Sequence, residues 1–299
     1  MPTAATAAPG PRVWLLAARP ATLPAAVAPV LVGSAAATVA VDFRLGPFLA
    51  ALLGAVFIQI GANYANDRAD FQRGADDAGR LGPTRATQAG LVSGRAMAIA
   101  TALSFALAAG CGVYLILAAG WPVLAVGVAS IVAGYLYTAG PWPYGYHGLG
   151  DLFVFAFFGV VAVMGSYFVQ AERLTWEAAA AAMPVACTVT AILVVNNLRD
   201  AASDRRAGKR TLAVIFGPTF ARGQYAFLLL AAPALIPIFA AAGLMPWWSM
   251  QAWLVLPAAA LLLRAVLGGA EGRGLNDVLK RTGQLHLLLG VLLALGYLW

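Results

Sequence analysis

Long apolar stretches separated by short polar connections make up most of the sequence. A helix that crosses a bilayer needs about 20 mainly apolar residues. Nine stretches meet this requirement, at residues 21–41, 47–65, 96–119, 121–139, 151–170, 177–198, 224–243, 247–267 and 283–299. The pattern therefore predicts an all-α polytopic membrane protein with about nine transmembrane helices. We expect one membrane domain over residues 1–299, with residues 1–12 as a flexible tail.

The composition supports this prediction, because 62% of the residues are hydrophobic and only 10% are charged. A soluble domain has about 25% charged residues. The composition therefore excludes a soluble domain. The net charge of +7 does not indicate a nucleic-acid partner, since the basic residues lie in the connections between apolar stretches.

Basic residues are distributed very unequally between the two sides of the predicted bundle. With nine spans, only Arg44 and Arg173 of the 19 Lys and Arg residues fall on one side. The other side holds Arg12, Arg19, Arg68, Arg73, Arg80, Arg85, Arg95, Arg199, Arg205, Arg206, Lys209, Arg210, Arg222, Arg264, Arg273, Lys280 and Arg281. Cytoplasmic connections are rich in Lys and Arg. We therefore expect a plasma-membrane protein (a bacterial inner-membrane protein) with a cytoplasmic N-terminus and an external C-terminus.

Two acidic motifs of similar design follow the second and sixth apolar stretches. The first motif contains Asn63, Asn66, Asp67 and Asp70, and the second contains Asn196, Asn197, Arg199, Asp200 and Asp204. Spacings of three and four residues place side chains on one face of a helix. Carboxylates are disfavoured at a helix C-terminus, so capping does not explain these positions. Hard cations such as Mg²⁺ bind carboxylates together with substrate phosphates, and the motifs therefore indicate a metal–diphosphate site at the membrane.

Basic and aromatic residues near the motifs are candidates for the rest of this site. Four cations could cover phosphate charge, namely Arg68, Arg199, Arg205 and Lys209. The candidates for an acceptor site or a carbocation path are Tyr135, Tyr137, Tyr144 and His147. Aromatic faces stabilise cations, but interfacial Tyr residues also form membrane belts, and a loop histidine is often only structural.

Several segments resemble the UbiA superfamily of intramembrane aromatic prenyltransferases. They are residues 19–24, 66–74 with 82–85, 144–151 with 157–159, 196–200 with 208–212, and 275–282. Within the superfamily they look like the MenA-type branch, which prenylates 1,4-dihydroxy-2-naphthoate. The resemblance covers nearly the whole chain.

The resemblance implies a helix bundle around a central cavity with a cytosolic cap. It also implies Mg²⁺-dependent transfer of a polyprenyl group from polyprenyl diphosphate, with a lateral opening to the lipid bilayer. By position it implies that Asp67, Asp70, Asp200 and Asp204 are catalytic. The metal ligands that it implies are Asn63, Asp67, Asp70, Asp76, Asn196, Asp200 and Asp204. Many relatives have an aspartate at the position of Gly74, and Asp76 or its neighbour Asp77 is expected to take its place. Many relatives also have a lysine between the fourth and fifth helices, and this chain has none between Arg95 and Glu172.

Two alternative functions remain open at this point. The first keeps the prenyltransferase and changes the acceptor to homogentisate, 4-hydroxybenzoate or a haem-like ring. The second is a transporter that uses intramembrane acids. A transporter predicts acidic residues near the middle of the helices, whereas here they cluster at one interface.

Overall fold

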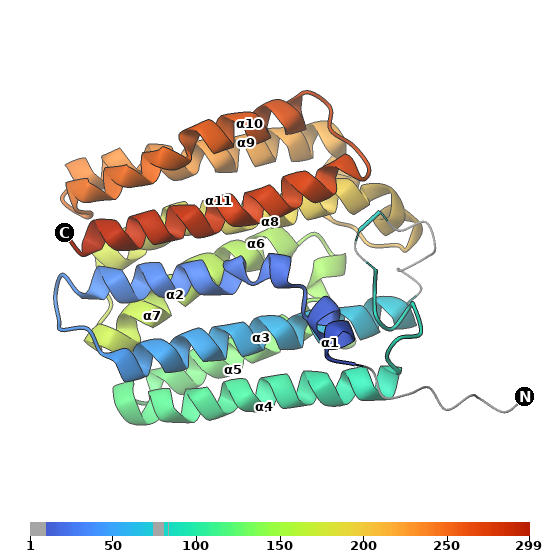
Figure 1. Cartoon of the computed structure of the whole chain (residues 1–299), viewed down its shortest axis with the longest axis horizontal. Helices are drawn as coiled ribbons and strands as arrows, with labels where there is room; N and C mark the ends of the chain where they lie inside the picture. Colours follow the sequence, from blue (N-terminus) through green and yellow to red (C-terminus); the bar gives the residue numbers. More distant parts are fainter. Residues whose placement is uncertain (1–9, 74–80, 83) are drawn as a thin grey trace, which may run out of the picture.

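The computed structural model describes residues 10–73, 81–82 and 84–299, and this part of the chain is a bundle of helices without strands (Figure 1). The first half contains α1 (Pro11–Ala18), η1 (Pro20–Thr22), α2 (Pro24–Ala37), α3 (Leu45–Gln72), α4 (Gly94–Ala119), α5 (Pro122–Leu136) and η2 (Tyr144–Tyr146). The second half contains α6 (Gly150–Val154), the π-helix η3 (Phe155–Val161), α7 (Ala162–Ala171), α8 (Trp176–Arg206), α9 (Leu212–Ala241), η4 (Trp247–Val255), α10 (Leu256–Leu267) and α11 (Gly274–Tyr297).

The all-α membrane architecture is confirmed, but the count of nine spans is not. Seven helical segments of the described residues are long and apolar enough to cross a bilayer. An eighth span results if Pro11–Thr22 and Pro24–Ala37, which are bent by 55° at their junction, are counted together. The remaining expected span, at residues 121–139, corresponds to α5, whose 15 residues are fewer than the about 20 that a perpendicular span needs.

Helix α8 lies at the centre of the bundle because its residues are small. It is rich in Ala, Val and Thr, and 83% of its most apolar window is buried inside the protein. Its N-cap is Thr175, whose hydroxyl accepts a hydrogen bond from the amide of Ala178. A Cβ added to Gly159 of η3 would lie 2.2 Å from Cβ of Ala186 on α8. Small residues therefore allow the two helix backbones to approach closely, as is usual in membrane bundles.

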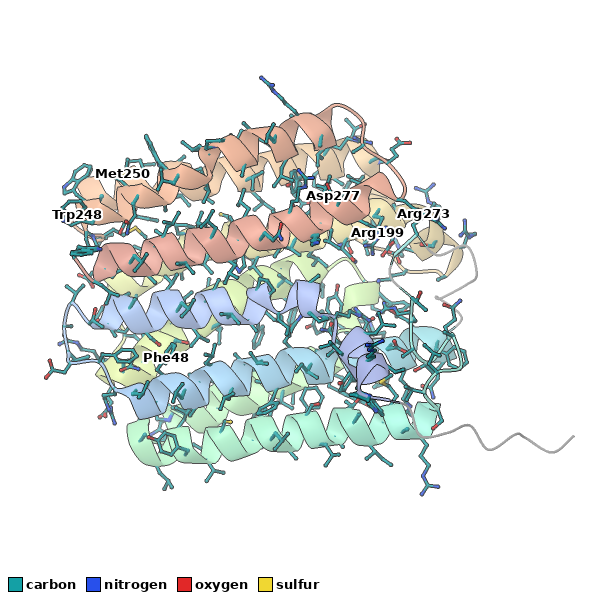
Figure 2. The ribbon with its side chains drawn as sticks, in the orientation of Figure 1. Phe48, Arg199, Trp248, Met250, Arg273 and Asp277 are labelled. Carbon is teal, nitrogen blue, oxygen red and sulfur yellow. The ribbon has the colours of Figure 1, made fainter. Side chains whose placement is uncertain are left out.

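The two ends of the bundle differ in polarity. Arg199, Arg273 and Asp277 lie at one end, and Trp248 and Met250 lie at the other (Figure 2). Helices α3 and α8 both reach the charged end with their C-terminal turns (Figure 1). The fold therefore brings both acidic motifs to the same end.

At the opposite end, the α2–α3 connection contacts the turn after α7. Arg44 forms an exposed ion pair of 2.8 Å with Glu172. Its backbone also exchanges two hydrogen bonds with the side chain of Gln170.

Candidate active site

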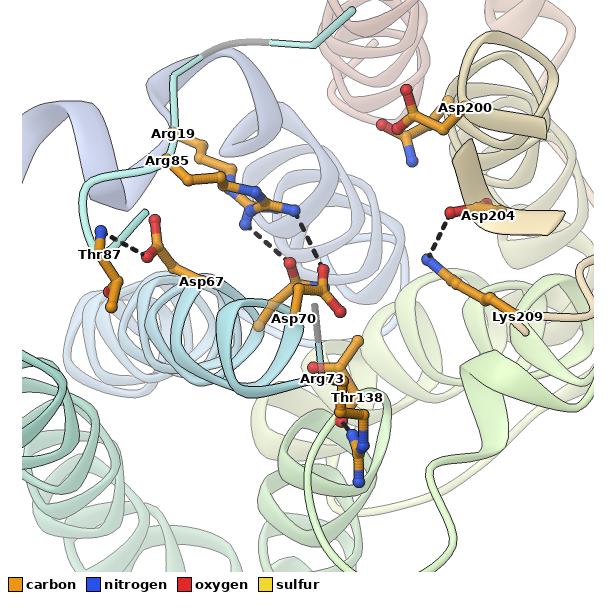
Figure 3. Close-up of polar contacts among 12 residues, drawn as sticks. Arg19, Asp67, Asp70, Arg73, Arg85, Thr87, Thr138, Asp200, Asp204 and Lys209 are labelled. Carbon is orange, nitrogen blue, oxygen red and sulfur yellow. Dashed lines mark hydrogen bonds and ion pairs between the residues drawn. The ribbon is translucent and has the colours of Figure 1, made fainter. Parts of the chain in front are cut away.

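The acidic motifs occupy the last turns of α3 and α8 and face each other across the end of the bundle (Figure 3). Asp67 and Asp70 lie on α3, Asp200 and Asp204 lie on α8, and all four are buried. Figure 3 shows the carboxylates of Asp70 and Asp204 directed toward the space between the two helices. The expected convergence of the four aspartates is therefore present in the fold.

Asp67 fixes the connection between α3 and α4. Its Oδ2 accepts a hydrogen bond of 2.9 Å from the amide of Ala86, and its Oδ1 accepts one of 2.9 Å from the amide of Thr87. Each carboxylate oxygen can accept a second bond. Asp67 therefore anchors the connection and keeps lone pairs for a further ligand.

Asp70 is held by two side chains from other parts of the chain. The Nη2 atom of Arg85 lies 3.2 Å from Oδ2, and the hydroxyl of Tyr146 donates a hydrogen bond of 2.8 Å to Oδ1. Nearby, Nη2 of Arg19 donates to Oδ1 of Asn66 at 2.8 Å. Three connecting segments therefore meet at the first motif.

Arg199 organises the second motif. Its guanidinium forms two hydrogen bonds with Asp200, of 2.8 Å to Oδ1 and 2.6 Å to Oδ2. It also donates to Oδ1 of Asn196 at 2.8 Å and to Oδ1 of Asn276 on α11 at 3.0 Å. Asn276 in turn donates to the carbonyl of Leu81 at 2.8 Å. This chain of bonds joins α8, α11 and the connection that follows the first motif.

Asp204 and Lys209 complete the second motif. The Nζ of Lys209 lies 3.6 Å from Oδ1 of Asp204, whereas Oδ2 of Asp204 is buried without a hydrogen-bond partner among the described residues. Burial alone would lower the pKa of Lys209, but the charges of Asp204, Asp70 and Asp200 outweigh it and raise that pKa above its ordinary value. Lys209 is therefore an ammonium ion at neutral pH and interacts electrostatically with carboxylates of both motifs.

Tyr146 connects the two motifs. Its ring lies 5.2 Å from the guanidinium carbon of Arg73 and 5.5 Å from Nζ of Lys209. Burial and the adjacent charge of Asp70 raise the pKa of the Tyr146 hydroxyl. The hydroxyl therefore stays protonated and donates to Asp70, while the ring face contacts two cations.

Some of the candidate residues lie elsewhere. Asn63 donates through Nδ2 to the carbonyl of Ala18 and to Oγ1 of Thr22, and so holds the N-terminal turn on α3. Arg205 donates to the carbonyl of Val214 at 3.4 Å. Asp76 lies outside the described residues.

The aromatic candidates divide into three groups. Tyr137 and Tyr144 pack edge to face, with ring centroids 5.5 Å apart, beside the α5–α6 connection that carries Tyr146. His147 is exposed and stacks on Trp142 at 4.7 Å. Tyr135 lines a separate cavity between α3, α4 and α5, together with the basic candidate Arg68.

Sequence reasoning missed Arg85, Tyr146, Arg19 and Asn276 as members of the site. All four belong to the segments that carry the family resemblance, which was the available signal. Their side chains reach the motifs from connections and helix ends through tertiary contacts. No periodic pattern within the sequence identifies such contacts.

The motifs offer the donor set that a magnesium ion prefers. Carboxylate and amide oxygens line both faces, and Mg²⁺ commonly adds substrate phosphate and water to one or two carboxylates. Among the described residues, no three His, Cys, Asp or Glu side chains are grouped closely enough to hold an ion by themselves. The buried free oxygen of Asp204 nevertheless fits a ligand that arrives with the substrate. The residues therefore fit Mg²⁺ that is bound jointly with a diphosphate.

Comparison with known proteins gives consistent relatives. The chain is 43% identical over 274 residues to a 1,4-dihydroxy-2-naphthoate octaprenyltransferase of Mycobacterium tuberculosis, covering 90% of this chain and 91% of that protein. It is 37% identical to the protein of the same name from Escherichia coli, covering 95% of this chain and 94% of that protein. A UbiA homologue from Archaeoglobus fulgidus, solved with GPP and Mg²⁺, has a TM-score of 0.67 at 16% identity, covering 95% of this chain and 99% of that one.

The family match agrees with these relatives and with the paired motifs. Residues 26–274 match the UbiA prenyltransferase family, and this range contains both acidic motifs and the connections that carry Arg85 and Tyr146. The chain therefore belongs to the UbiA prenyltransferase family.

Proposed function

We propose that this protein transfers a polyprenyl group from polyprenyl diphosphate to 1,4-dihydroxy-2-naphthoate, with Mg²⁺ as cofactor. The acceptor loses its carboxylate as CO₂, and the product is the hydroquinone form of demethylmenaquinone, an intermediate of menaquinone synthesis. The observation that carries the proposal is the pair of facing carboxylate motifs, each with its own cations, at one end of a membrane bundle. The choice of acceptor rests on relatives of that name, which are 43% and 37% identical to this chain.

The diphosphate would bind between the two motifs. Asp67, Asp70, Asp200 and Asp204 would hold Mg²⁺, which supplies Lewis-acid stabilisation of the negative charge on the departing diphosphate. Lys209 would bind phosphate oxygens directly, since it lies between the motifs and stays charged. Arg85 and Arg199 now neutralise Asp70 and Asp200, and they would add fixed positive charge at the edge of the same space.

The reaction begins when the bond between the first prenyl carbon and its diphosphate oxygen breaks. The electron pair leaves with the diphosphate, and an allylic cation forms at that carbon. Fixed cations aimed at the leaving group stabilise the charge that develops there. Tyr137 and Tyr144 form an aromatic pair beside this space, and their faces would stabilise the cation.

The acceptor ring then supplies the electron pair for the new bond. The ring carbon that bears the carboxylate attacks the cation, and loss of CO₂ restores the aromatic ring. Productive attack requires the two carbons about 3–3.5 Å apart, so the width of the acceptor matters. Homogentisate and 4-hydroxybenzoate are single rings and would place the attacking carbon differently.

Product analysis by mass spectrometry tests this proposal. Purified protein is given several prenyl diphosphates, Mg²⁺ and one of three acceptors: dihydroxynaphthoate, homogentisate or 4-hydroxybenzoate. We expect the naphthoate to react fastest, with one CO₂ released per product, and we expect EDTA to stop the reaction. Comparable turnover of a single-ring acid would reject the acceptor, and full activity in excess EDTA would reject the metal. Absence of transfer to any acceptor would favour the transporter alternative.

We also propose that the site faces the cytoplasm of a plasma membrane. Both motif connections carry many basic residues, whereas the opposite end carries Arg44 and Arg173. The soluble diphosphate head and the aromatic acid would then reach the site from the cytoplasm, and the polyprenyl tail would remain in the bilayer.

A further inference from the structure

A cavity of about 460 Å³ lies between α3, α4 and α5, outside the group of acidic side chains. Its polar wall is formed by Arg68, Gln72 and Arg73 near the end of α3, with Thr101 on α4. Phe105 and Tyr135 contribute to its apolar wall. None of the two motifs' aspartates and no other acidic residue lines this cavity within the described part of the chain. The proposed transfer reaction does not use this cavity.

Arg68 gives the cavity a positive charge, and no acidic group among the described residues matches it. Its Nε is buried and has no hydrogen-bond partner among the described residues. A buried guanidinium donor without a partner is costly, because it has lost its hydration. An anion bound in the cavity would remove this cost. Guanidinium groups bind phosphate oxygens especially well because their donors form a planar fork.

Arg73 supports the same wall in a fixed position. Its guanidinium donates to the carbonyls of Thr138 and Gly140 and lies over the ring of Tyr146. Its position is therefore set by the α5–α6 connection. Two cations near the end of α3, one of them held in place, favour an anionic group over a neutral one.

The level of Arg68 relative to the membrane and the apolar face of α5 beside the cavity indicate that the anion carries an apolar chain. Arg68 follows the apolar stretch of α3 by three residues, which is the level of lipid head groups. Tyr135 is 41% exposed, and above it on α5 the side chains of Val132, Val128 and Leu124 are also exposed. These four lie on one face of the helix, because they are spaced by three or four residues. An acyl chain could lie along this face while its phosphate contacts Arg68.

We propose that this cavity binds the phosphate of an anionic phospholipid from the cytoplasmic leaflet. The site is separate from the proposed donor site and does not depend on the proposed reaction. A phosphodiester with one negative charge fits two arginines. A prenyl diphosphate would bring more charge and a magnesium requirement, and the described residues that line the cavity include no carboxylate for the metal.

Native mass spectrometry of the purified full-length protein tests the proposal directly. The probes are phosphatidylglycerol and phosphatidylcholine with the same acyl chains, offered at equal concentration. We expect the wild-type protein to retain phosphatidylglycerol in preference to phosphatidylcholine. Arg68→Gln should reduce this preference about tenfold, the change expected for loss of one charged hydrogen bond.

Arg95→Gln is the matched control, since Arg95 is exposed at the start of α4 and does not line the cavity. It should keep the wild-type preference. Ala102→Phe is a second test that leaves both arginines in place, because Ala102 lines the cavity at an exposed position. The added ring should fill the space and also weaken retention of phosphatidylglycerol.

Three results would overturn the proposal. The first is equal retention of the two lipids by the wild-type protein. The second is the same loss of preference in Arg95→Gln as in Arg68→Gln. The third is displacement of bound phosphatidylglycerol by geranyl diphosphate without Mg²⁺, which would assign the cavity to the prenyl donor. Because the measurement is lipid retention, failure of this proposal is distinguishable from failure of the proposed transferase activity.

Discussion

Asp204 differs from the other three motif aspartates in its hydrogen bonding. Both carboxylate oxygens of Asp67, Asp70 and Asp200 accept a hydrogen bond from the protein, whereas Oδ2 of Asp204 is buried without a partner. A buried carboxylate oxygen without a donor costs about 1–3 kcal/mol. This cost falls on a single carboxylate oxygen of the two motifs. It would be relieved if Oδ2 of Asp204 bound a group that arrives with the substrate.

Asp204→Ala should therefore remove activity without a comparable loss of stability. We expect turnover to fall at least about 100-fold, since even weaker outer contacts of a metal cost 10–100-fold. The thermal midpoint should change less than the activity, because the lost ion pair with Lys209 is long, at 3.6 Å, and Lys209 keeps the charges of Asp70 and Asp200 nearby. Asp277→Asn is the control, since Asp277 is exposed and forms an ion pair with Arg281 on the same helix. Equal losses in the two variants would contradict a special role for Asp204.

Tyr146 allows the hydroxyl and the ring to be tested separately. Tyr146→Phe removes the donor to Asp70 and keeps the ring face between Arg73 and Lys209. A hydrogen bond to a charged group contributes about 1.5–3 kcal/mol, so we expect kcat/KM to fall about 10–100-fold. Tyr146→Ala should be more severe, because the ring is lost as well.

Tyr135→Phe provides the comparison for Tyr146→Phe, since Tyr135 lines the separate cavity between α3, α4 and α5. Steady-state kinetics with a short prenyl diphosphate would measure both. Wild-type kinetics in Tyr146→Phe would show that the hydroxyl does not position Asp70 for the reaction.

Among the elements, the π-helix η3 depends on its close approach to α8. A methyl group at Gly159 would overlap Ala186, with Cβ atoms 2.2 Å apart, so the helices would have to separate. Overpacking of this kind costs about 1–3 kcal/mol. Gly159→Ala should therefore lower the thermal midpoint of the detergent-purified protein. Gly110→Ala should not lower it, since nothing lies within 4 Å of a Cβ at Gly110. Unchanged midpoints in both variants would contradict the packing argument.

The ends of the helices show what hydropathy can and cannot predict. Apolar stretches placed spans at 47–65, 177–198 and 283–299, whereas α3 runs to Gln72, α8 runs to Arg206 and α11 begins at Gly274. Hydropathy reports where the bilayer ends, but backbone hydrogen bonds continue the helix into polar sequence. The motifs therefore lie within rigid helical turns.

The candidate site also contains residues that the sequence could predict and residues that it could not. The four aspartates could be predicted because helical spacing repeats in both motifs. Arg85 and Tyr146 could not, because each reaches Asp70 from a connection without a periodic pattern. Arg68 was predicted to bind diphosphate from its position beside Asp67, but one residue along a helix turns the side chain by about 100°. It lines the cavity between α3, α4 and α5.

For the molecule as a whole, the unequal ends imply an orientation in the membrane. The motif end carries Arg85, Arg199 and Lys209, and the opposite end carries the Arg44–Glu172 pair and exposed Trp side chains at 247 and 248. Basic residues near spans favour the cytoplasmic side, and Trp is common at membrane interfaces. This asymmetry would hold even if α5 does not cross the whole bilayer, provided that its two connections stay at opposite ends.

Cysteine labelling can establish this orientation. Cys111 and Cys187 are first replaced by Ala, and single cysteines are then introduced at Ala89, in the connection after the first motif, and at Ala242, after α9. Both positions are exposed, so accessibility depends on the side of the membrane. A membrane-impermeant maleimide should label Ala242→Cys in intact cells and Ala89→Cys only after permeabilisation. Labelling under denaturing conditions serves as the control for thiol reactivity. Reaction of Ala89→Cys in intact cells would reverse the topology and leave the motifs facing away from the cytoplasmic supply of both substrates.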